Sequence, residues 1–102
     1  RVFRSEWYEK KLDKLEKSEK LIVEAFEQRL KIEPYSGKPL GYRFFREKKF
    51  GAKRVLFLVY EKHGAVFMIT ITDKKAQKNE IDMIKRNLDF YNELLNNVIK
   101  KL

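Results

Sequence analysis

The sequence predicts an α+β fold, in which an N-terminal helical hairpin packs on a small antiparallel sheet and one long helix follows the sheet. Three observations support this fold class. Apolar residues recur at helical spacing through residues 5–33, β-branched and aromatic runs occupy 53–61 and 65–72, and helical spacing returns from about residue 79. The chain of 102 residues has the length of one domain. We therefore expect residues 1–102 to form a single domain.

The first third of the chain has the pattern of a short strand followed by two helices. Residues 1–4 alternate polar and apolar, and Ser5 is a candidate N-cap for a first helix over about 5–16. Ser18 is a candidate N-cap for a second helix, which ends at Pro34 because proline cannot continue a helix. The short joint between the two helices predicts an antiparallel helical hairpin.

Beyond a turn-rich loop over 34–39, the apolar period changes to that of strands. Residues 42–48 alternate around two phenylalanines, and the two runs that follow are separated by His63 and Gly64. These three segments predict an antiparallel three-stranded meander. Because the last two strands are apolar on both faces, we expect helices on more than one side of the sheet.

The last predicted element is a helix from about Asn79 to the end of the chain. Its apolar residues recur at steps of three and four: Ile81, Ile84, Leu88, Tyr91, Leu95, Val98 and Leu102. This stripe predicts packing within the same domain, and pairing with another helix is the alternative.

The charge is concentrated in the middle of the chain. The sequence holds 24 basic and 15 acidic side chains, and its formal net charge is +9. Residues 34–63 contain eight basic and two acidic side chains, whereas residues 1–33 contain nine and eight and residues 64–102 contain seven and five. A concentrated positive field indicates a polyanionic partner such as nucleic acid or an anionic membrane surface. A solubilising surface without a ligand is the alternative.

Several classes of protein and site are disfavoured by composition. The absence of cysteine excludes a disulfide framework and thiolate zinc sites, and fits a reducing compartment. The single histidine argues against an imidazole metal cluster. No apolar run approaches the ~20 residues of a membrane span, and the chain has no Gly-rich phosphate loop or nucleophile elbow. We expect no metal, no cofactor and no membrane partner.

Two basic clusters are the candidate functional residues. The first contains Arg43, Arg46, Lys48, Lys49, Lys53 and Arg54, and the second contains Lys74, Lys75 and Lys78. Arg46 and Arg54 lie beside apolar strand residues, so a buried stem can hold each guanidinium rigidly for bidentate phosphate contact. We expect both clusters to converge in one cationic hollow that is shaped for an RNA strand. The alternative is a solvated hairpin with ordinary surface cations.

The remaining polar and aromatic candidates carry weaker signals. Tyr42 and Tyr60 are candidates for stacking on bases, or else half-buried sheet residues. His63 has the pattern of a solvated turn residue rather than a catalytic group. Glu47 and Asp73 are the acids near the basic clusters, and we expect them to form local ion pairs.

Four short motifs resemble those of RelE/ParE-superfamily toxins. Residues 37–40 (Gly-Lys-Pro-Leu), 42–46 (Tyr-Arg-Phe-Phe-Arg) and 53–57 (Lys-Arg-Val-Leu-Phe) resemble that family's sheet, which commonly has a Tyr-Arg-x-Arg-like strand followed by Tyr-Arg-Val-Leu-Tyr. Residues 74–78 (Lys-Lys-Ala-Gln-Lys) look like the Lys-Lys-Thr-Gln-Lys signature of the phage-derived, HigB-like branch. The order of predicted elements is similar over nearly the whole chain.

The resemblance implies a RelE-like toxin of a type II toxin–antitoxin pair, commonly an endoribonuclease that cuts mRNA on the ribosome without a metal. By position, Arg54 matches the family's arginine after the hairpin turn, and Arg46 (or Arg43) matches the basic residue of the preceding strand. Lys74 and Lys75 match the basic pair after the last strand. We therefore predict catalytic roles for Arg46, Arg54, Lys74 and Lys75, and RNA contacts for Arg43, Lys48, Lys49, Lys53 and Lys78.

The resemblance also implies the partners: a cognate antitoxin, the ribosome and mRNA, all in the cytoplasm. Either a homodimer or a toxin–antitoxin hetero-oligomer is compatible with it. The sequence departs from the family where many relatives carry a His or Tyr, because Thr70, Thr72 and Asp73 occupy that neighbourhood. Lys53 replaces the usual tyrosine before the arginine, so proton transfer to the leaving group is unassigned. A ParE-like, non-enzymatic inhibitor of DNA gyrase and a catalytically silent binding module are the alternatives.

Overall fold

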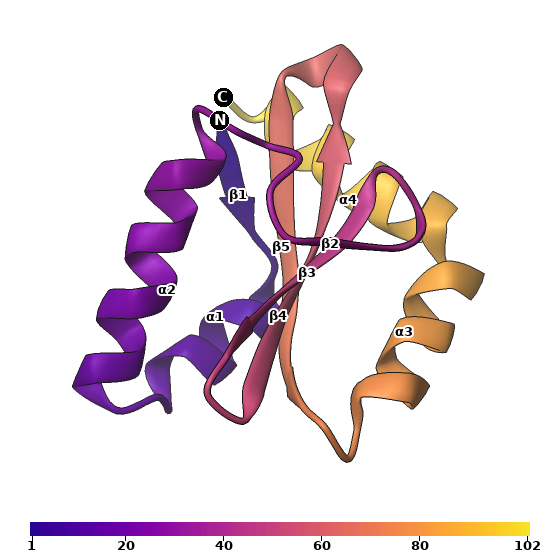
Figure 1. Ribbon diagram of the computed structural model, residues 1–102. Helices are drawn as coiled ribbons and strands as arrows, with labels where there is room; N and C mark the ends of the chain where they lie inside the picture. Colours follow the sequence, from indigo (N-terminus) through magenta and orange to yellow (C-terminus); the bar gives the residue numbers. More distant parts are fainter.

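A five-stranded mixed sheet lies at the centre of the computed structural model, which describes residues 1–102 (Figure 1). In spatial order its strands are β1 (Val2–Arg4), β5 (Ala65–Asp73), β4 (Lys53–Tyr60), β3 (Phe45–Phe50) and β2 (Lys38–Tyr42). β1 runs parallel to β5, and the other neighbouring strands are antiparallel. The α+β class is confirmed, but the sheet is larger than the predicted three-stranded meander and is mixed rather than antiparallel.

The two additional strands have different origins. The strand over residues 1–4 was predicted, but its local pattern could not reveal that it pairs with β5, 64 residues later. β2 was predicted in part as a loop because it contains Pro39 and Gly41. A proline is tolerated there because β2 is an edge strand.

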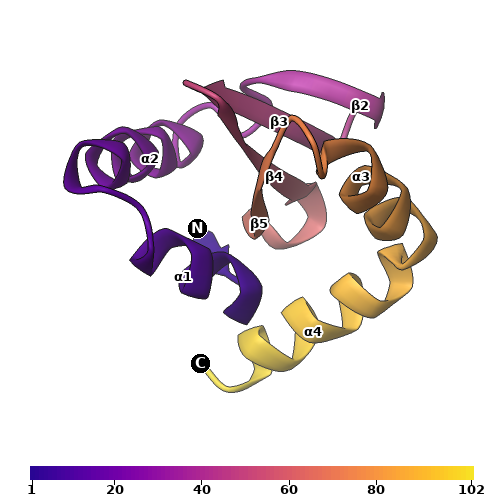
Figure 2. The ribbon, with the colours of Figure 1, turned by 90° about the horizontal axis from the view of Figure 1, so that it is seen from below.

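The N-terminal helices cover one face of the sheet. α1 (Glu6–Asp13) begins after Ser5, whose Oγ accepts a hydrogen bond from the Tyr8 backbone N–H, so this predicted cap is confirmed. α2 (Lys17–Leu30) follows after a short connection in which the chain changes direction (Figures 1 and 2). Its N-cap is Glu16, which forms a capping box with Glu19, so the prediction of Ser18 as the cap was wrong.

The C-terminal helices cover the opposite face, as the view from below shows (Figure 2). The prediction of one long helix was wrong, because α3 (Gln77–Arg86) and α4 (Leu88–Lys100) are separate. Asn87 interrupts the helix with φ −124° and ψ 29°, and its side chain donates to the Met83 carbonyl at 2.7 Å. This break turns the apolar stripe of α4 onto the sheet, which confirms packing within the chain.

Two apolar cores result, one on each face. α1 and α2 pack on one face through a cluster that includes Tyr8, Phe26, Val55 and Phe57. The cluster of the other face includes Phe45, Leu56, Ile84, Tyr91 and Leu95. Alternate residues of β4 belong to different clusters, which confirms that helices cover both sides of the sheet. The direction of each polar side chain on β3 and β4 is fixed by the same alternation.

Candidate nucleic-acid interface

Arg54 is the best-positioned cation of the predicted site. It is the second residue of β4, where it pairs with Lys49 of β3 and Thr72 of β5. Its neighbour Val55 belongs to the core under α1 and α2, so Arg54 points to the face that α3 and α4 cover. Only 12% of its side chain is exposed, so the apolar stem is held and the guanidinium has little freedom.

The Arg54 guanidinium is incompletely satisfied. Its Nε lies 3.9 Å from Glu47 Oε2, a distance at the outer limit of an ion pair. Its Nη1 is buried and has no hydrogen-bond partner. An unpaired buried donor on a charged group is costly, and an anionic ligand with free lone pairs would remove that cost. The Arg54 guanidinium therefore keeps an unused donor at this position of β4.

Glu47 and Gln77 complete this buried cluster. The Glu47 side chain is 9% exposed and accepts a hydrogen bond from Gln77 Nε2 at 2.7 Å, which links β3 to the first residue of α3. The ion pair predicted for Glu47 is confirmed. The contact of Gln77 with Glu47 was not predicted from the sequence. The pairing of β3 with β4 across the turn at Gly51 does place Glu47 and Arg54 on the same face of the sheet. No local pattern indicates that α3 folds back over that face.

Three other predicted cations point to the opposite face. Arg46 pairs with Phe57, Lys48 with Val55 and Lys53 with Phe50, and these three partners belong to the core under α1 and α2. The expectation that all the basic side chains converge in one hollow was therefore wrong. Residues of a strand alternate between its faces, so Arg46 and Arg54 face opposite ways across the hairpin.

Each of these three side chains has a local partner. Arg46 donates to the backbone carbonyls of Ser36 (3.0 Å), Gly37 (3.0 Å) and Arg43 (2.9 Å), and so fixes the loop that leads into β2. Lys53 pairs with Glu19 of α2 at 3.1 Å. The Lys48 ammonium lies 5.7 Å from the Phe26 ring centroid, a cation–π distance.

The second basic cluster lies between β5 and α3. Lys74 and Lys75 occupy the turn and Lys78 the first turn of α3, and all three are exposed. Asp73 Oδ1 accepts a hydrogen bond from the Ala76 N–H at 2.8 Å and so fixes this turn; the ion pair expected for Asp73 was wrong. Thr72 of β5 pairs with Arg54, and the turn begins at Lys74, two residues after Thr72. Lys49, Arg54 and the turn thus lie at one end of the sheet.

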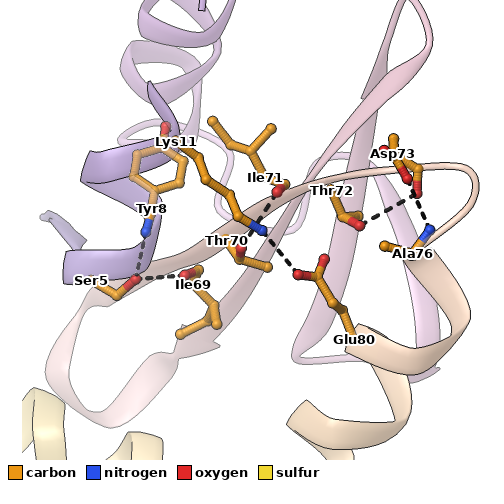
Figure 3. A network of polar contacts seen from close by, with 10 residues as sticks. All are labelled: Ser5, Tyr8, Lys11, Ile69, Thr70, Ile71, Thr72, Asp73, Ala76 and Glu80. Atoms are coloured by element: carbon orange, nitrogen blue, oxygen red, sulfur yellow. Dashed lines mark hydrogen bonds and ion pairs between the residues drawn. The ribbon is translucent and has the colours of Figure 1, made fainter. Parts of the chain in front are cut away.

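Polar contacts hold the start of α3 in place (Figure 3). Lys11 of α1 forms an ion pair with Glu80 of α3 at 2.9 Å, across the end of β5. Ser5 Oγ donates to the Ile69 carbonyl of β5. A hollow of about 250 Å³ beside this end of β5 brings Lys53 together with Lys11 and Lys14, two cations that the sequence did not single out.

The remaining candidates lie at the other end of the sheet. The Arg43 guanidinium carbon lies 3.7 Å from the Tyr35 ring centroid. Tyr42 stacks on Phe44, and Tyr60 ends β4 half-buried. His63 is exposed in the short 3₁₀ turn after β4, as predicted for a turn residue.

No group of three or more His, Cys, Asp or Glu side chains is arranged to hold a metal ion. None of the helices combines the length and apolar character that crossing a bilayer requires.

Solved structures share this fold. No family model and no curated protein matches the sequence. The isolated E. coli RelE toxin is 17% identical with a TM-score of 0.65, and the match covers 83% of this chain and 95% of that one. A double mutant of E. coli RelE in the free state is 19% identical with a TM-score of 0.69 over 83% and 94%. A chain of the intact E. coli RelBE toxin–antitoxin complex is 17% identical with a TM-score of 0.64 over 71% and 93%. The chain therefore has a RelE-like α+β fold.

Proposed function

We propose that this protein is the toxin of a toxin–antitoxin pair and an endoribonuclease that cuts mRNA on the ribosome. The observation that carries the proposal is the buried Arg54 guanidinium, whose Nη1 has no partner and which lies among exposed lysines at one end of the sheet. The RelE-like fold supports it, and the pattern of residues 74–78 supports placing the chain in the HigB-like branch. Residues 1–102 act as one toxin domain, in the cytoplasm.

The scissile phosphate binds at Arg54 in this proposal. Arg54 donates to a non-bridging phosphate oxygen through its guanidinium and remains charged throughout, so it stabilises the pentacoordinate transition state. Lys49, Lys74, Lys75 and Lys78 attract the RNA backbone and bind neighbouring phosphates. The N-cap of α3, Ala76, provides no capping side chain, so the N–H groups of the first turn also favour an anion.

The reaction proceeds by attack of the ribose 2′-oxygen on the adjacent phosphorus. The bond from phosphorus to the 5′-oxygen breaks, leaving a 2′,3′-cyclic phosphate and a 5′-hydroxyl. Glu47, the carboxylate paired with Arg54, accepts the 2′-hydroxyl proton, and the ammonium group of Lys74 or Lys75 protonates the leaving oxygen. Arg46 positions the loop before β2 and does not touch the RNA at this site.

The antitoxin neutralises the toxin by covering this cationic end of the sheet with an acidic segment. Complementary charge favours such a partner, because the chain carries a formal net charge of +9. An adjacent reading frame that encodes a small acidic protein would support this partner.

The test is induced expression with and without the neighbouring gene, scored by growth and by primer extension on translated mRNA. We expect growth arrest and codon-positioned cuts, and both should be lost in Arg54→Gln, with a fall in cleavage rate of roughly 100- to 1000-fold. Arg29→Gln is the matched control, because Arg29 is exposed on α2 and pairs only with Glu33. Circular dichroism checks that Arg54→Gln folds.

The same experiment separates the alternatives. Intact message with altered DNA supercoiling would contradict the nuclease and support the ParE-like inhibitor of gyrase. Intact message without growth arrest would support a silent binding module. Cleavage that persists in Arg54→Gln would place the reacting phosphate elsewhere.

A further inference from the structure

A second surface with cations and aromatic rings lies at the far end of β4 from Arg54. It surrounds a hollow of about 400 Å³ lined by Tyr35, Arg43, Phe44, Tyr60 and Lys62, which we call the aromatic hollow. Tyr60 is six residues beyond Arg54 in the same strand, a separation of ~20 Å at the rise of a β-strand. The aromatic hollow is therefore distinct from the proposed cleavage site.

The rings of this surface are available for stacking. Phe44 and Tyr42 stack on each other with centroids 4.9 Å apart and an interplanar angle of 26°, although 36% and 43% of these residues stay exposed. A solvent-exposed stacked pair is a platform on which a flat ligand can continue the stack. Tyr42 itself does not line the hollow, whereas the half-buried Tyr60 lines it together with Phe44.

The aromatic hollow is also preorganised. Arg46 fixes its rim by donating to the carbonyls of Ser36, Gly37 and Arg43, which lie on both sides of β2. The Arg43 guanidinium rests on the Tyr35 ring at 3.7 Å, so the side chain is held while its donors remain exposed. A binding surface that is already ordered loses little entropy when its ligand arrives.

The charge of the aromatic hollow indicates the class of ligand. Arg43 and Lys62 contribute positive charge, and Glu61 is the one acid in the lining. Aromatic rings interleaved with cations are the arrangement that binds single-stranded nucleic acid, because bases stack on rings while phosphates pair with cations.

We propose that the aromatic hollow binds an unpaired nucleotide of single-stranded RNA. Its base stacks on the Phe44–Tyr42 pair, and its phosphates contact Arg43 and Lys62. The choice of RNA rests on the proposed function, but binding here does not require cleavage. The aromatic hollow is then a second binding site for the RNA strand that the protein cuts.

The test uses a fluorescently labelled hexanucleotide of 2′-O-methyl RNA, which lacks the nucleophile and cannot be cut. Fluorescence anisotropy measures its affinity for the full chain. We expect Phe44→Ala to weaken binding by roughly 5- to 100-fold, the effect of losing one stacked base. Phe44→Trp should retain the affinity, because a larger ring preserves stacking.

Two further variants sharpen the experiment. Phe90→Ala is the matched control, because Phe90 is 47% exposed on α4 and does not line the hollow; its affinity should equal that of the parent. Lys62→Gln should make the dependence of log affinity on log salt shallower by about 0.7, the contribution of one phosphate contact to a single strand.

The proposal is overturned if Phe44→Ala and Arg43→Gln both bind the oligonucleotide as tightly as the parent. If these variants instead weaken only the antitoxin complex, the hollow is a protein-docking surface and the proposal is equally wrong. Failure of the nuclease proposal looks different: the parent would leave ribosome-bound mRNA intact, whatever its affinity for the uncleavable oligonucleotide.

Discussion

Glu27 is the buried acid on which the N-terminal helices depend. Its carboxylate accepts two hydrogen bonds from Arg4, at 2.9 and 3.1 Å, and a third from the Tyr8 hydroxyl. Burial and the bond to Glu27 raise the pKa of Tyr8. This carboxylate joins β1, α1 and α2, so Arg4 and Tyr8 lose their acceptor together if it is removed.

We expect Glu27→Ala to lower the free energy of unfolding by about 3 kcal/mol, because it leaves a partly buried guanidinium and a buried hydroxyl unpaired. Urea denaturation measures the change. The control is Glu33→Ala, which removes an exposed ion pair with Arg29 and should cost about 0.5 kcal/mol or less. Equal losses in the two variants would mean that the Glu27 network does not stabilise the fold.

Tyr60 predicts how stability responds to alkaline pH. Burial, with a smaller effect from Tyr91, raises the pKa of the Tyr60 hydroxyl from 10.0 to about 12. The folded state therefore holds this proton more tightly than the unfolded state. Its stabilising contribution is complete below pH 10 and is lost as the pH rises towards 12.

Urea midpoints between about pH 9 and about pH 11.5 measure this effect. We expect the midpoint of the parent to fall across this range and that of Tyr60→Phe to fall less steeply, because phenylalanine has no proton to lose. A residual slope should remain, since the pKa of Tyr91 is also raised by burial. The same slope in both proteins would show that Tyr60 titrates normally.

Individual site residues could be predicted from the sequence only where the alternation of side chains between the two faces of a strand was taken into account. The basic character of β3 and β4 is evident in the sequence, and the Arg54 side chain is largely buried with one unpaired nitrogen. Arg46 was grouped with it because both lie beside apolar strand residues. The register around Gly51 instead puts Lys49, not Arg46, beside Arg54. The contact of Gln77 with Glu47 depends on how α3 packs on the sheet, and no local sequence pattern encodes that packing.

The contact between the loop before β2 and β3 is the tightest backbone approach among the glycines. A Cβ on Gly37 would lie 2.3 Å from the Glu47 carbonyl oxygen, and Gly37 has φ +81°. Gly64, in the turn before β5, has φ +55° but open space around it. An alanine at either position would therefore strain the backbone. Only at Gly37 would its Cβ also clash with a neighbouring strand.

We expect Gly64→Ala to cost about 1 kcal/mol, the strain of a left-handed residue. Gly37→Ala should cost about 3 kcal/mol or more, because β3 must also shift. Thermal unfolding compares the two variants. Since the clash is at Glu47, Gly37→Ala should also reduce RNA cleavage at temperatures where it stays folded. Equal melting temperatures would mean that the loop moves away freely.

Elements with a clear period were predicted, and the ends that were wrong are those of the helices other than the start of α1. The spacing of apolar residues gave α1, α2, β4 and β5, because each buries a regular face. The two C-terminal helices were merged because the apolar stripe continues through Asn87, and the break depends on a side chain that bonds to the Met83 carbonyl. Glu16 was missed as a cap because glutamate is a less common N-cap than serine.

The salt dependence of RNA binding reports how many lysines of the whole molecule contact phosphates. Each contact to a single strand contributes about −0.7 to the slope of log affinity against log salt. We expect Lys49→Gln to make the slope shallower by about that amount. Lys17→Gln should leave it unchanged, because Lys17 is exposed at the start of α2, on the other face of the sheet. Equal changes of slope in the two variants would mean that RNA responds to the overall positive charge and does not contact defined lysines.

The parallel pairing of β1 with β5 affects how the chain folds during its synthesis. β1 pairs only with β5, through Val2, Phe3 and Arg4 opposite Val66, Phe67 and Met68, so during synthesis β1 must wait for the last of the five strands along the chain. At translation speeds of roughly 5–20 residues per second, that wait lasts seconds. A nascent chain therefore cannot complete its sheet until β5 has left the ribosome, and α3, which follows β5, can cover Arg54 only after that.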